Sequence, residues 1–194
     1  MQKLTLDDTL NILEYEKVRP QFRRRIIDLK KIRRVAVGDH VTFVFENRDT
    51  ALFQIQEMIR IERLVDEDRI AEEIAVYNSM IPDENELSAT LFIEFGDRSA
   101  LHPALQELAG LDQHVTLHIG DRAESSVPAC FEAGRARPDS ISAVQYLRFP
   151  LTPEGSEAVR CGDDPLKIVI DHPAYRESTV LPVETRAALA QDLE

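Results

Sequence analysis

The sequence predicts an α+β protein with a mainly antiparallel sheet in the second half of the chain and an N-terminal helical layer. Three observations support this prediction. Apolar residues at helical spacing are concentrated in the first part of the chain, and runs that alternate between apolar and polar residues dominate the second part. Such alternation is typical of half-exposed antiparallel strands, because parallel strands are usually buried on both faces. The two kinds of run are clustered and do not strictly alternate, which favours α+β over α/β.

The composition fits one globular domain over residues 1–194. Of the 194 residues, 43% are hydrophobic and 30% are charged, and a chain of this length buries a core without disulfides or structural metals. No apolar run approaches the ~20 residues that a membrane-spanning helix needs. The opening "MQKLTLDDTL" carries acids and no apolar signal-peptide core. We therefore expect a cytoplasmic protein that does not enter the membrane.

The first strong helical pattern covers Lys17–Arg34. Its apolar residues recur at helical spacing: Val18, Phe22, Ile26, Leu29 and Ile32. Because proline is best tolerated in the first turn of a helix, Pro20 predicts that this helix begins near residues 18–20. A shorter helix is expected before it, around Asp7–Tyr15.

Positive charge is concentrated in the same segment. The whole chain has a net charge of −12, yet residues 17–34 contain nine basic residues and one acid, a local charge of +8, which leaves −20 on the rest. This asymmetry indicates either a contact surface for a partner or a helix that docks on the acidic body of its own protein. The basic residues expected to form the contact surface are Arg23, Arg24, Lys30, Lys31 and Arg34.

Nucleic acids and nucleotides are poor ligands for this chain. A charge of −20 outside the basic segment would repel a polyanion, and no nucleic-acid-binding motif is present. The glycines never form the G-x-G or G-K-[ST] patterns of phosphate-binding loops, so no nucleotide cofactor is expected. A protein is therefore the partner that we expect for the basic segment.

Two strands are expected around a turn at Gly38 and Asp39. In the second strand, apolar residues alternate with Thr42 and Glu46, although Val44 breaks the alternation. The polar turn "ENRD" then begins a helix, and another helix is expected over about Glu67–Met80, before "IPDEN" ends it. These helices complete the N-terminal helical layer.

The second half contains four alternating segments: "ELSATLFIEF", "HVTLHIG", "SAVQYLRFPL" and "LKIVIDH". We expect each of them to form a strand, with short helices near Pro103–Leu108 and Pro182–Leu193. Asp121–Ser140 is the only long irregular segment of the sequence, and structureless stretches of ~20 residues are rare in compact domains. It is a mobile loop, a lid or a wrongly assigned segment.

The helix that follows "ENRD" leads to a site hypothesis. With 100° per residue, Glu62 falls inside the arc of apolar residues, and Glu73 does so more weakly on the next helix. An ionised carboxylate among apolar residues is costly unless it is paired, coordinated or protonated. Three interpretations of Glu62 follow. It pairs with an arginine of the basic helix, or it anchors a divalent-metal or acid–base site with Glu73 and a histidine from the sheet, or it reaches solvent.

The other candidate residues have simpler structural explanations. His114 and His118 lie on an alternating strand, where four residues separate them by roughly 13 Å, too far to share a metal. Asp171, His172 and Tyr175 stand near a strand end, where catalytic groups often lie. No recognisable nucleophile accompanies them, so we expect a structural role for this group.

Four strings of the sequence are distinctive: "RRVAVGDHVTFVFENRDTALFQIQEMIRIER", "YNSMIPDENELSATLFIEF", "AVQYLRFPL" and "IDHPAY". They resemble a family of uncharacterised bacterial proteins of about this length, and the similarity spans Leu4 to Leu193. Members of that family are often encoded beside rubrerythrin and an iron–sulphur oxidoreductase. The resemblance therefore implies a link to peroxide defence or electron transfer, and it assigns no reaction or site residue. The chain itself has no di-iron signature, and Cys130 and Cys161 form no cluster-binding or zinc-binding pair.

These observations predict a non-catalytic accessory or interaction protein of a bacterial redox or oxidative-stress system, which contacts a protein partner through its basic helix. The alternative is a small metal-binding protein or a metal-dependent enzyme that uses Glu62. The sequence contains no complete catalytic set and indicates no substrate. Whether the protein is an enzyme, which metal it would take and its oligomeric state are left open by the sequence.

Overall fold

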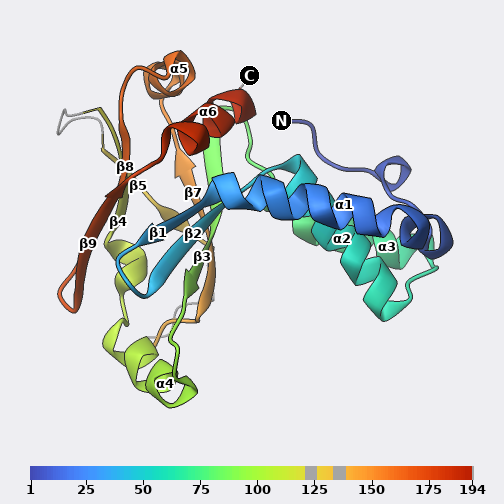
Figure 1. Ribbon diagram of the computed structural model, residues 1–194, viewed down its shortest axis with the longest axis horizontal. Helices are drawn as coiled ribbons and strands as arrows, with labels where there is room; N and C mark the ends of the chain where they lie inside the picture. Colours follow the sequence, from blue (N-terminus) through green and yellow to red (C-terminus); the bar gives the residue numbers. More distant parts are fainter. Residues whose placement is uncertain (121–125, 133–138, 194) are drawn as a thin grey trace.

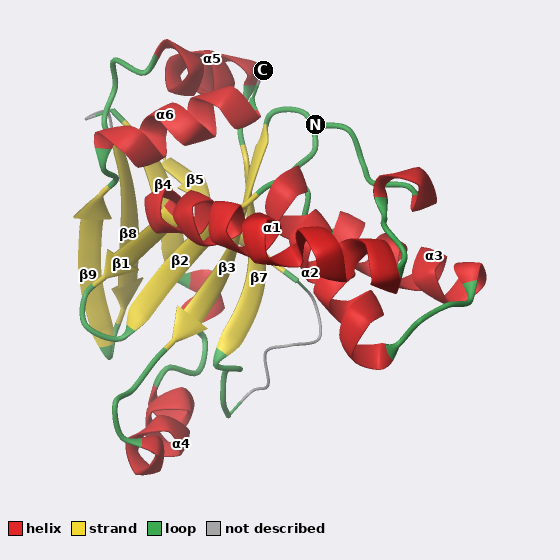
Figure 2. Cartoon of the chain, turned by 45° about the vertical axis from the view of Figure 1, so that its right-hand side comes forward, coloured by secondary structure: helices red, strands yellow, loops and turns green. Residues whose placement is uncertain are grey.

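The computed structural model describes residues 1–120, 126–132 and 139–193, and within these ranges it has an α+β fold (Figure 1). The predicted fold class is confirmed. The strands form two antiparallel sheets, and three helices extend from them to one side as a separate arm (Figures 1 and 2). None of the helices in the described part of the chain has the length and apolar character that a membrane crossing needs.

The five-stranded sheet has the strand order β1-β2-β3-β7-β6, and every neighbouring pair is antiparallel. Its strands are β1 (Arg34–Val37), β2 (Val41–Glu46), β3 (Glu86–Ile93), β7 (Val144–Pro150) and β6 (Cys130–Phe131). The expected turn at Gly38 joins β1 to β2, with Gly38 in the left-handed region at φ +68°. Strands from both halves of the sequence therefore share one sheet.

The four-stranded sheet has the order β5-β4-β8-β9. Its strands are β5 (Ser126–Pro128), β4 (Val115–Ile119), β8 (Leu166–His172) and β9 (Tyr175–Val180). The two sheets meet where β9 lies beside β1. There the Tyr175 hydroxyl donates a hydrogen bond to the Val37 carbonyl (2.7 Å) and accepts one from the His40 amide (3.1 Å).

Apolar side chains from both sheets form the main core, the sheet core. Phe45 and Phe149 are fully buried in it, with ring centroids 6.4 Å apart. Leu117 and Ile168 of the four-stranded sheet belong to the same cluster. The alternation seen in the sequence is thus the inward and outward alternation of two sheets that face each other.

The region expected to be irregular, Asp121–Ser140, contains ordered strands. Residues 126–128 and 130–131 form β5 and β6, so the assignment as one long irregular segment was wrong for them. Both strands are too short for an alternation to be recognised in the sequence, since two or three residues contain at most one repeat. Residues 121–125 and 133–138 lie outside the described residues.

Three helices form the arm: α1 (Ile12–Arg33), α2 (Arg48–Glu62) and α3 (Glu67–Asn78). They have a small core of their own, the arm core, made of Leu4, Ala51, Ile55, Ile59, Leu64, Ile74 and Ile81. The "ENRD" turn begins α2 as predicted, because the Asn47 side chain accepts a hydrogen bond from the Thr50 amide (3.0 Å). Figure 1 shows α1 beginning at the far end of the arm and running back to the sheets, where β1 follows it directly.

The predicted start of α1 near Pro20 is wrong. The helix begins at Ile12, after a side-chain cap by Asn11, and only the 3-10 turn Leu6–Asp8 precedes it. Pro20 lies exposed inside the helix, where a proline costs about 3 kcal/mol because one backbone hydrogen bond is lost. Tyr15 and Ile26, which are buried on either side of it, hold the helix against its neighbours, and this packing outweighs the local preference.

A charged cluster fastens α1 to α2. The Glu57 carboxylate accepts hydrogen bonds from the Tyr15 hydroxyl (2.7 Å) and from two nitrogens of Arg19 (2.7 and 2.9 Å). The Arg19 hydrogen bonds hold the pKa of the Glu57 carboxyl below its ordinary value of 4.5. Burial, and then the Glu57 carboxylate, raise the pKa of the Tyr15 phenol. The ion pair that was expected to tie the helices together therefore exists, but Glu57 makes it instead of Glu62.

Replacing Glu57 by glutamine is expected to lower the free energy of unfolding by about 1 kcal/mol at neutral pH, because a charged, partly buried hydrogen-bonded pair is lost. Since the folded-state pKa is lowered, the contribution of Glu57 is complete above its ordinary pKa and disappears as the pH falls through the folded value. Urea unfolding of wild type and E57Q should be measured from neutral to acidic pH. The difference between their free energies of unfolding should shrink as the pH falls. E16Q, which removes only a more exposed pair with Arg60, should change stability less. A difference between wild type and E57Q that stays constant into acid would contradict this account.

The remaining helices flank the sheets. They are α4 (Arg98–Glu107), α5 (Pro153–Cys161) and α6 (Val183–Asp192). The sequence analysis missed α5, although Thr152 as N-cap, Pro153 in the first turn and Gly162 after the end are its start and stop signals. Figure 1 shows α5 and α6 together over the end of the sheets opposite α4.

A buried ion pair joins the end of α1 to α6. The Arg33 guanidinium donates to both oxygens of Asp192 (2.6 and 2.7 Å), and these side chains are only 3% and 5% exposed. Burial raises the pKa of the Asp192 carboxyl, while Arg33 and, more weakly, the side chain of Asn47, the N-cap of α2, act in the opposite direction. This cluster lies where the arm and the sheets meet, and it connects three helices.

Candidate functional site

The two carboxylates predicted for a metal site lie on the arm. Glu62 is the last residue of α2 and is exposed, and Glu73 is half-buried on α3. Both act on Tyr77: burial raises the pKa of its phenol most, followed by the charge of Glu73, with a smaller effect of Glu62. In the described ranges, no group of three or more histidine, cysteine, aspartate or glutamate side chains is arranged to hold a metal. The metal role of Glu62 and Glu73 stays a prediction.

The prediction that Glu62 lies in the buried face of α2 is wrong. The buried stripe of this helix ends at Ile59. Arg63 then adopts a left-handed conformation (φ +54°) and turns the chain, so that Leu64 covers the end of the arm core. Glu62 is therefore left in solvent although its helical phase matches the stripe.

Gln56 is a buried polar residue in the middle of α2, although the helical phase places it outside the apolar arc. Its side chain is 1% exposed and accepts a hydrogen bond from the Leu10 amide (2.9 Å) while donating one to the Leu10 carbonyl (3.2 Å). The N-terminal segment lies over this side of α2 and buries it. The sequence around Gln56 could not predict this burial, because the segment that covers Gln56 comes from a distant part of the chain.

Part of the basic segment docks on the protein itself. Arg34 pairs with Glu94 (2.8 Å), and Lys31 pairs with Asp28 one turn earlier in α1 (2.8 Å). Arg33, which was not predicted as a contact residue, forms the buried pair described above. Two of the five predicted contact residues thus have acidic partners within the chain.

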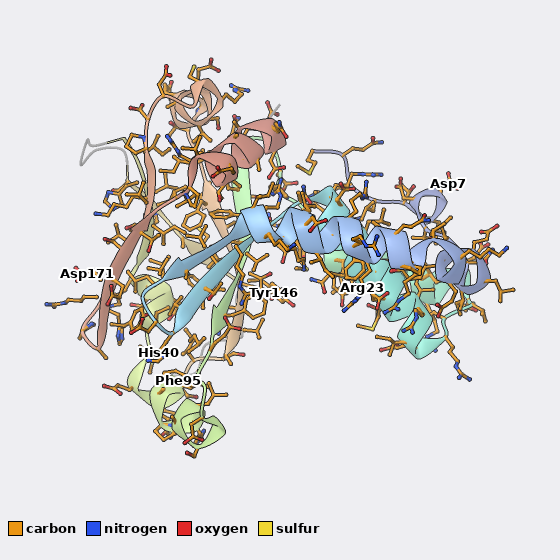
Figure 3. All side chains as sticks on the ribbon, in the orientation of Figure 1. Asp7, Arg23, His40, Phe95, Tyr146 and Asp171 are labelled. Carbon is orange, nitrogen blue, oxygen red and sulfur yellow. The ribbon has the colours of Figure 1, made fainter. Side chains whose placement is uncertain are left out.

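The other three predicted contact residues are Arg23, Arg24 and Lys30. Arg23 and Arg24 are exposed, Lys30 is half-exposed, and none of them makes an ion pair within the described ranges. Ile27 lies between them on the helix and is 43% exposed. Figure 3 shows Arg23 on the arm, well away from the sheets. We call Arg23, Arg24, Ile27, Lys30 and Lys31 the basic face of α1.

The structure brings His172 and Tyr175 together as cross-strand neighbours on β8 and β9, but Asp171 lies in the adjacent position, opposite Arg176. Asp171 is exposed and pairs with Arg176 (3.2 Å), whereas Tyr175 binds the backbone of β1. His172 is buried, with Nε2 bonded to the Ala109 carbonyl (3.0 Å) and Nδ1 accepting from the Ala174 amide (3.2 Å). Both ring nitrogens are thus occupied by backbone groups, which supports the structural role expected for this histidine.

The two histidines of β4 have different neighbours. His114 meets a residue of another element: its ring lies edge-on to that of His172, with centroids 5.3 Å apart. His118 Nε2 lies 3.1 Å from the Thr116 hydroxyl of the same strand. Each of these contacts joins two side chains and includes no carboxylate, so neither contact forms a set of metal ligands.

A cavity that the sequence analysis missed lies on the outer face of the five-stranded sheet. Its volume is about 330 Å³, and it opens between the strands and the segment that follows α3. Its lining includes Glu46, Met80, Ser88, Cys130, Tyr146 and Arg148. Figure 3 shows Tyr146 where the sheet faces the arm. The register explains the grouping, because Glu46 pairs with Ser88, which in turn pairs with Arg148.

Glu46 is the distinctive group of this cavity. It is 3% exposed, and its Oε1 accepts a hydrogen bond from the Thr90 hydroxyl (2.7 Å). Its Oε2 is buried and has no hydrogen-bond partner among the described residues. A buried carboxylate oxygen without a donor is unusual and costly, which makes it the strongest sign of a ligand in this molecule.

One signal in the sequence could have revealed Glu46. The alternation of β2 places Glu46 and Thr42 on the face opposite the core, and a solvent-facing row was therefore expected. Val44 lies in the same row, however, and all six residues of β2 are buried. An apolar residue between two polar ones on a face expected to be exposed indicates that another element packs there, and α1 does contact β2.

Comparison with known proteins identifies a family and a similar solved structure. Residues 3–193 match the model of a family described as "Protein of unknown function (DUF3501)". The fold is similar to the crystal structure of a novel protein of unknown function from Burkholderia pseudomallei K96243, with a TM-score of 0.92, 36% sequence identity and coverage of 100% of both chains. No curated protein matches the sequence.

Proposed function

The chain belongs to the DUF3501 family of proteins of unknown function, and from that premise we propose that it is a non-catalytic accessory protein that binds an acidic protein partner through the basic face of α1. The partner is a component of a bacterial redox or oxidative-stress system in the cytoplasm. The contact is electrostatic, with Ile27 as an apolar centre.

The single observation that carries this proposal is the charge left unpaired on α1. Arg23, Arg24 and Lys30 stand together on the outer side of a helix in a protein whose net charge is −12. Neighbouring basic residues of α1 have found acids within the chain, for example Arg25 with Asp49 (3.1 Å). Arginine and exposed apolar residues are enriched at protein interfaces. An acidic partner would complement this face, and the acidic remainder of the chain would repel the partner from other faces.

The redox context of the proposal is carried by the resemblance to proteins encoded beside rubrerythrin and an iron–sulphur oxidoreductase. This chain supplies no evident redox centre in its described residues, where Cys130 and Cys161 are free and exposed. A role in binding or positioning another protein fits that context better than a role in electron transfer. The two neighbouring gene products are therefore the first partners to test.

Reversing two charges of the basic face is expected to weaken the contact at least tenfold, which corresponds to about 1.4 kcal/mol. Binding of wild type and R23E/R24E to the purified rubrerythrin and iron–sulphur oxidoreductase of the same bacterium would be measured by biolayer interferometry. The wild-type affinity should also fall between about 50 mM and about 300 mM salt, because exposed charges are screened.

R160E/R176E is the matched control for this experiment. It makes the same change in net charge at two exposed arginines of α5 and β9, away from the basic face, and should bind like wild type. Equal binding by R23E/R24E and wild type would disprove the contact surface. Failure of both candidate proteins to bind wild type at low salt would disprove the redox partnership.

A further inference from the structure

We propose that the cavity beside Glu46 binds a small organic cation, an ammonium group attached to an apolar body. This site is separate from the basic face of α1. Its anchor is Glu46, whose Oε2 is buried and receives no hydrogen bond from the described residues, while Oε1 receives one from Thr90. A buried carboxylate oxygen without a hydrogen-bond donor destabilises the protein. A ligand that donates a hydrogen bond to Oε2 would remove this cost, and that gain would favour binding.

The cations of the protein near the cavity already have partners. Arg148 donates to Glu86 (3.0 Å), and Lys3 pairs with Asp83 (2.7 Å). These two pairs balance each other in charge, and the cavity lining adds the carboxylates of Glu46 and Glu132. A cationic ligand is attracted to such a site, whereas an anion is repelled.

The walls of the cavity suit the rest of the proposed ligand. Met80 offers apolar surface, and Tyr146, which the register places on the same face of the sheet as Glu46, adds an aromatic ring. Aromatic ring faces attract alkylammonium groups, and the attraction grows where water is excluded. A volume of about 330 Å³ is at the small end of the range for ligand pockets, which fits one aromatic ring or a short alkyl chain.

A divalent metal suits this cavity less well. In the part of the chain that the structure describes, no set of three or more histidine, cysteine, aspartate or glutamate side chains is arranged to hold one. An organic ammonium needs only one carboxylate oxygen and an apolar surround. This is the combination that Glu46 and the walls provide.

The experiment uses the full chain labelled with carbon-13 at the methionine methyl groups. Of the three methionines, Met80 lines the cavity, while Met1 and Met58 do not and serve as internal references. Benzylammonium, phenethylammonium and hexylammonium would be titrated to millimolar concentration and followed by NMR. We expect saturable shifts of the Met80 methyl signal, with little change at the other two. Phenethyl alcohol, which has the same body without the charge, should bind at least tenfold more weakly.

Glu46→Gln tests the anchor. The amide keeps the shape and an acceptor for Thr90, and ammonium binding should fall at least tenfold. Glu84→Gln removes an exposed carboxylate in the loop before β3 and should bind like wild type. If E46Q does not fold, the comparison of ammonium with alcohol on wild type still decides the matter. The proposal is overturned if none of the three ammonium probes shifts Met80, if the alcohol binds as well, if folded E46Q binds like wild type, or if magnesium or zinc alone produces the shift.

Discussion

Replacing Arg33 by methionine is expected to lower the free energy of unfolding by about 3–5 kcal/mol, because it leaves a buried charge without a partner. Arg33 and Asp192 are 3% and 5% exposed and share two hydrogen bonds. Removing the guanidinium leaves the buried Asp192 carboxylate without its two hydrogen bonds from Arg33 and without a balancing charge. Guanidinium chloride unfolding of R33M and wild type measures the difference.

Two further variants show whether the loss comes from this pair. R33M/D192L removes both charges and replaces them by apolar side chains, so it should recover most of the stability lost by R33M. R25M breaks an exposed pair on the same helix, with side chains 59% and 43% exposed, and should cost less than about 1 kcal/mol. If R33M were as mild as R25M, the pair would not be the connection between arm and sheets.

Replacing Phe45 by alanine is expected to cost about 3–5 kcal/mol, since it removes a fully buried ring from the sheet core. We propose that residues 1–194 unfold as one domain, because β2 runs into α2 through a single residue, Asn47, and the Arg33–Asp192 pair closes the same junction. F45A should therefore speed up hydrogen exchange at the slowest amides of both β3 in the sheet and α2 in the arm. The free energy of opening calculated from these rates should fall by a similar amount in the two elements.

The half-exposed ring of Phe92 provides the control for this substitution. F92A should lower the stability by clearly less than F45A, because less apolar surface leaves water when that ring packs. Faster exchange of β3 in F45A with unchanged exchange of α2 would show that the arm unfolds independently. The chain would then have two domains instead of one.

Alternation and helical spacing predicted the fold class because each is set by short stretches of the chain. The strands β3, β4, β7 and β8 all lie where the sequence alternates. Pro20 shows the limit of such local rules. The preference of proline for a first turn is worth about 3 kcal/mol, and the buried contacts of Tyr15 and Ile26 with other elements outweigh it.

The candidate sites were harder to predict for the same reason. Helical phase predicted that Glu62 is buried and Glu57 is exposed. In the structure Glu62 is exposed, because the helix ends at Arg63, and Glu57 is half-buried, because α1 packs against it. The Glu46 cavity brings together residues from β2, β6, β7 and the end of α3, which are far apart in the sequence. Only the register of the strands places them side by side. The positive charge of α1, in contrast, is visible in the composition alone. The structure adds which of its basic residues form ion pairs within the chain and which form the basic face.

The proposed function depends on the basic face of α1 being the contact surface for a protein partner. Hydrogen exchange of the chain, alone and saturated with the redox partner that binds it, tests this claim most directly. We expect slower exchange in α1, centred on residues 20–31, and little change in β8, β9 and α5. Protection of those distant elements with none in α1 would contradict it.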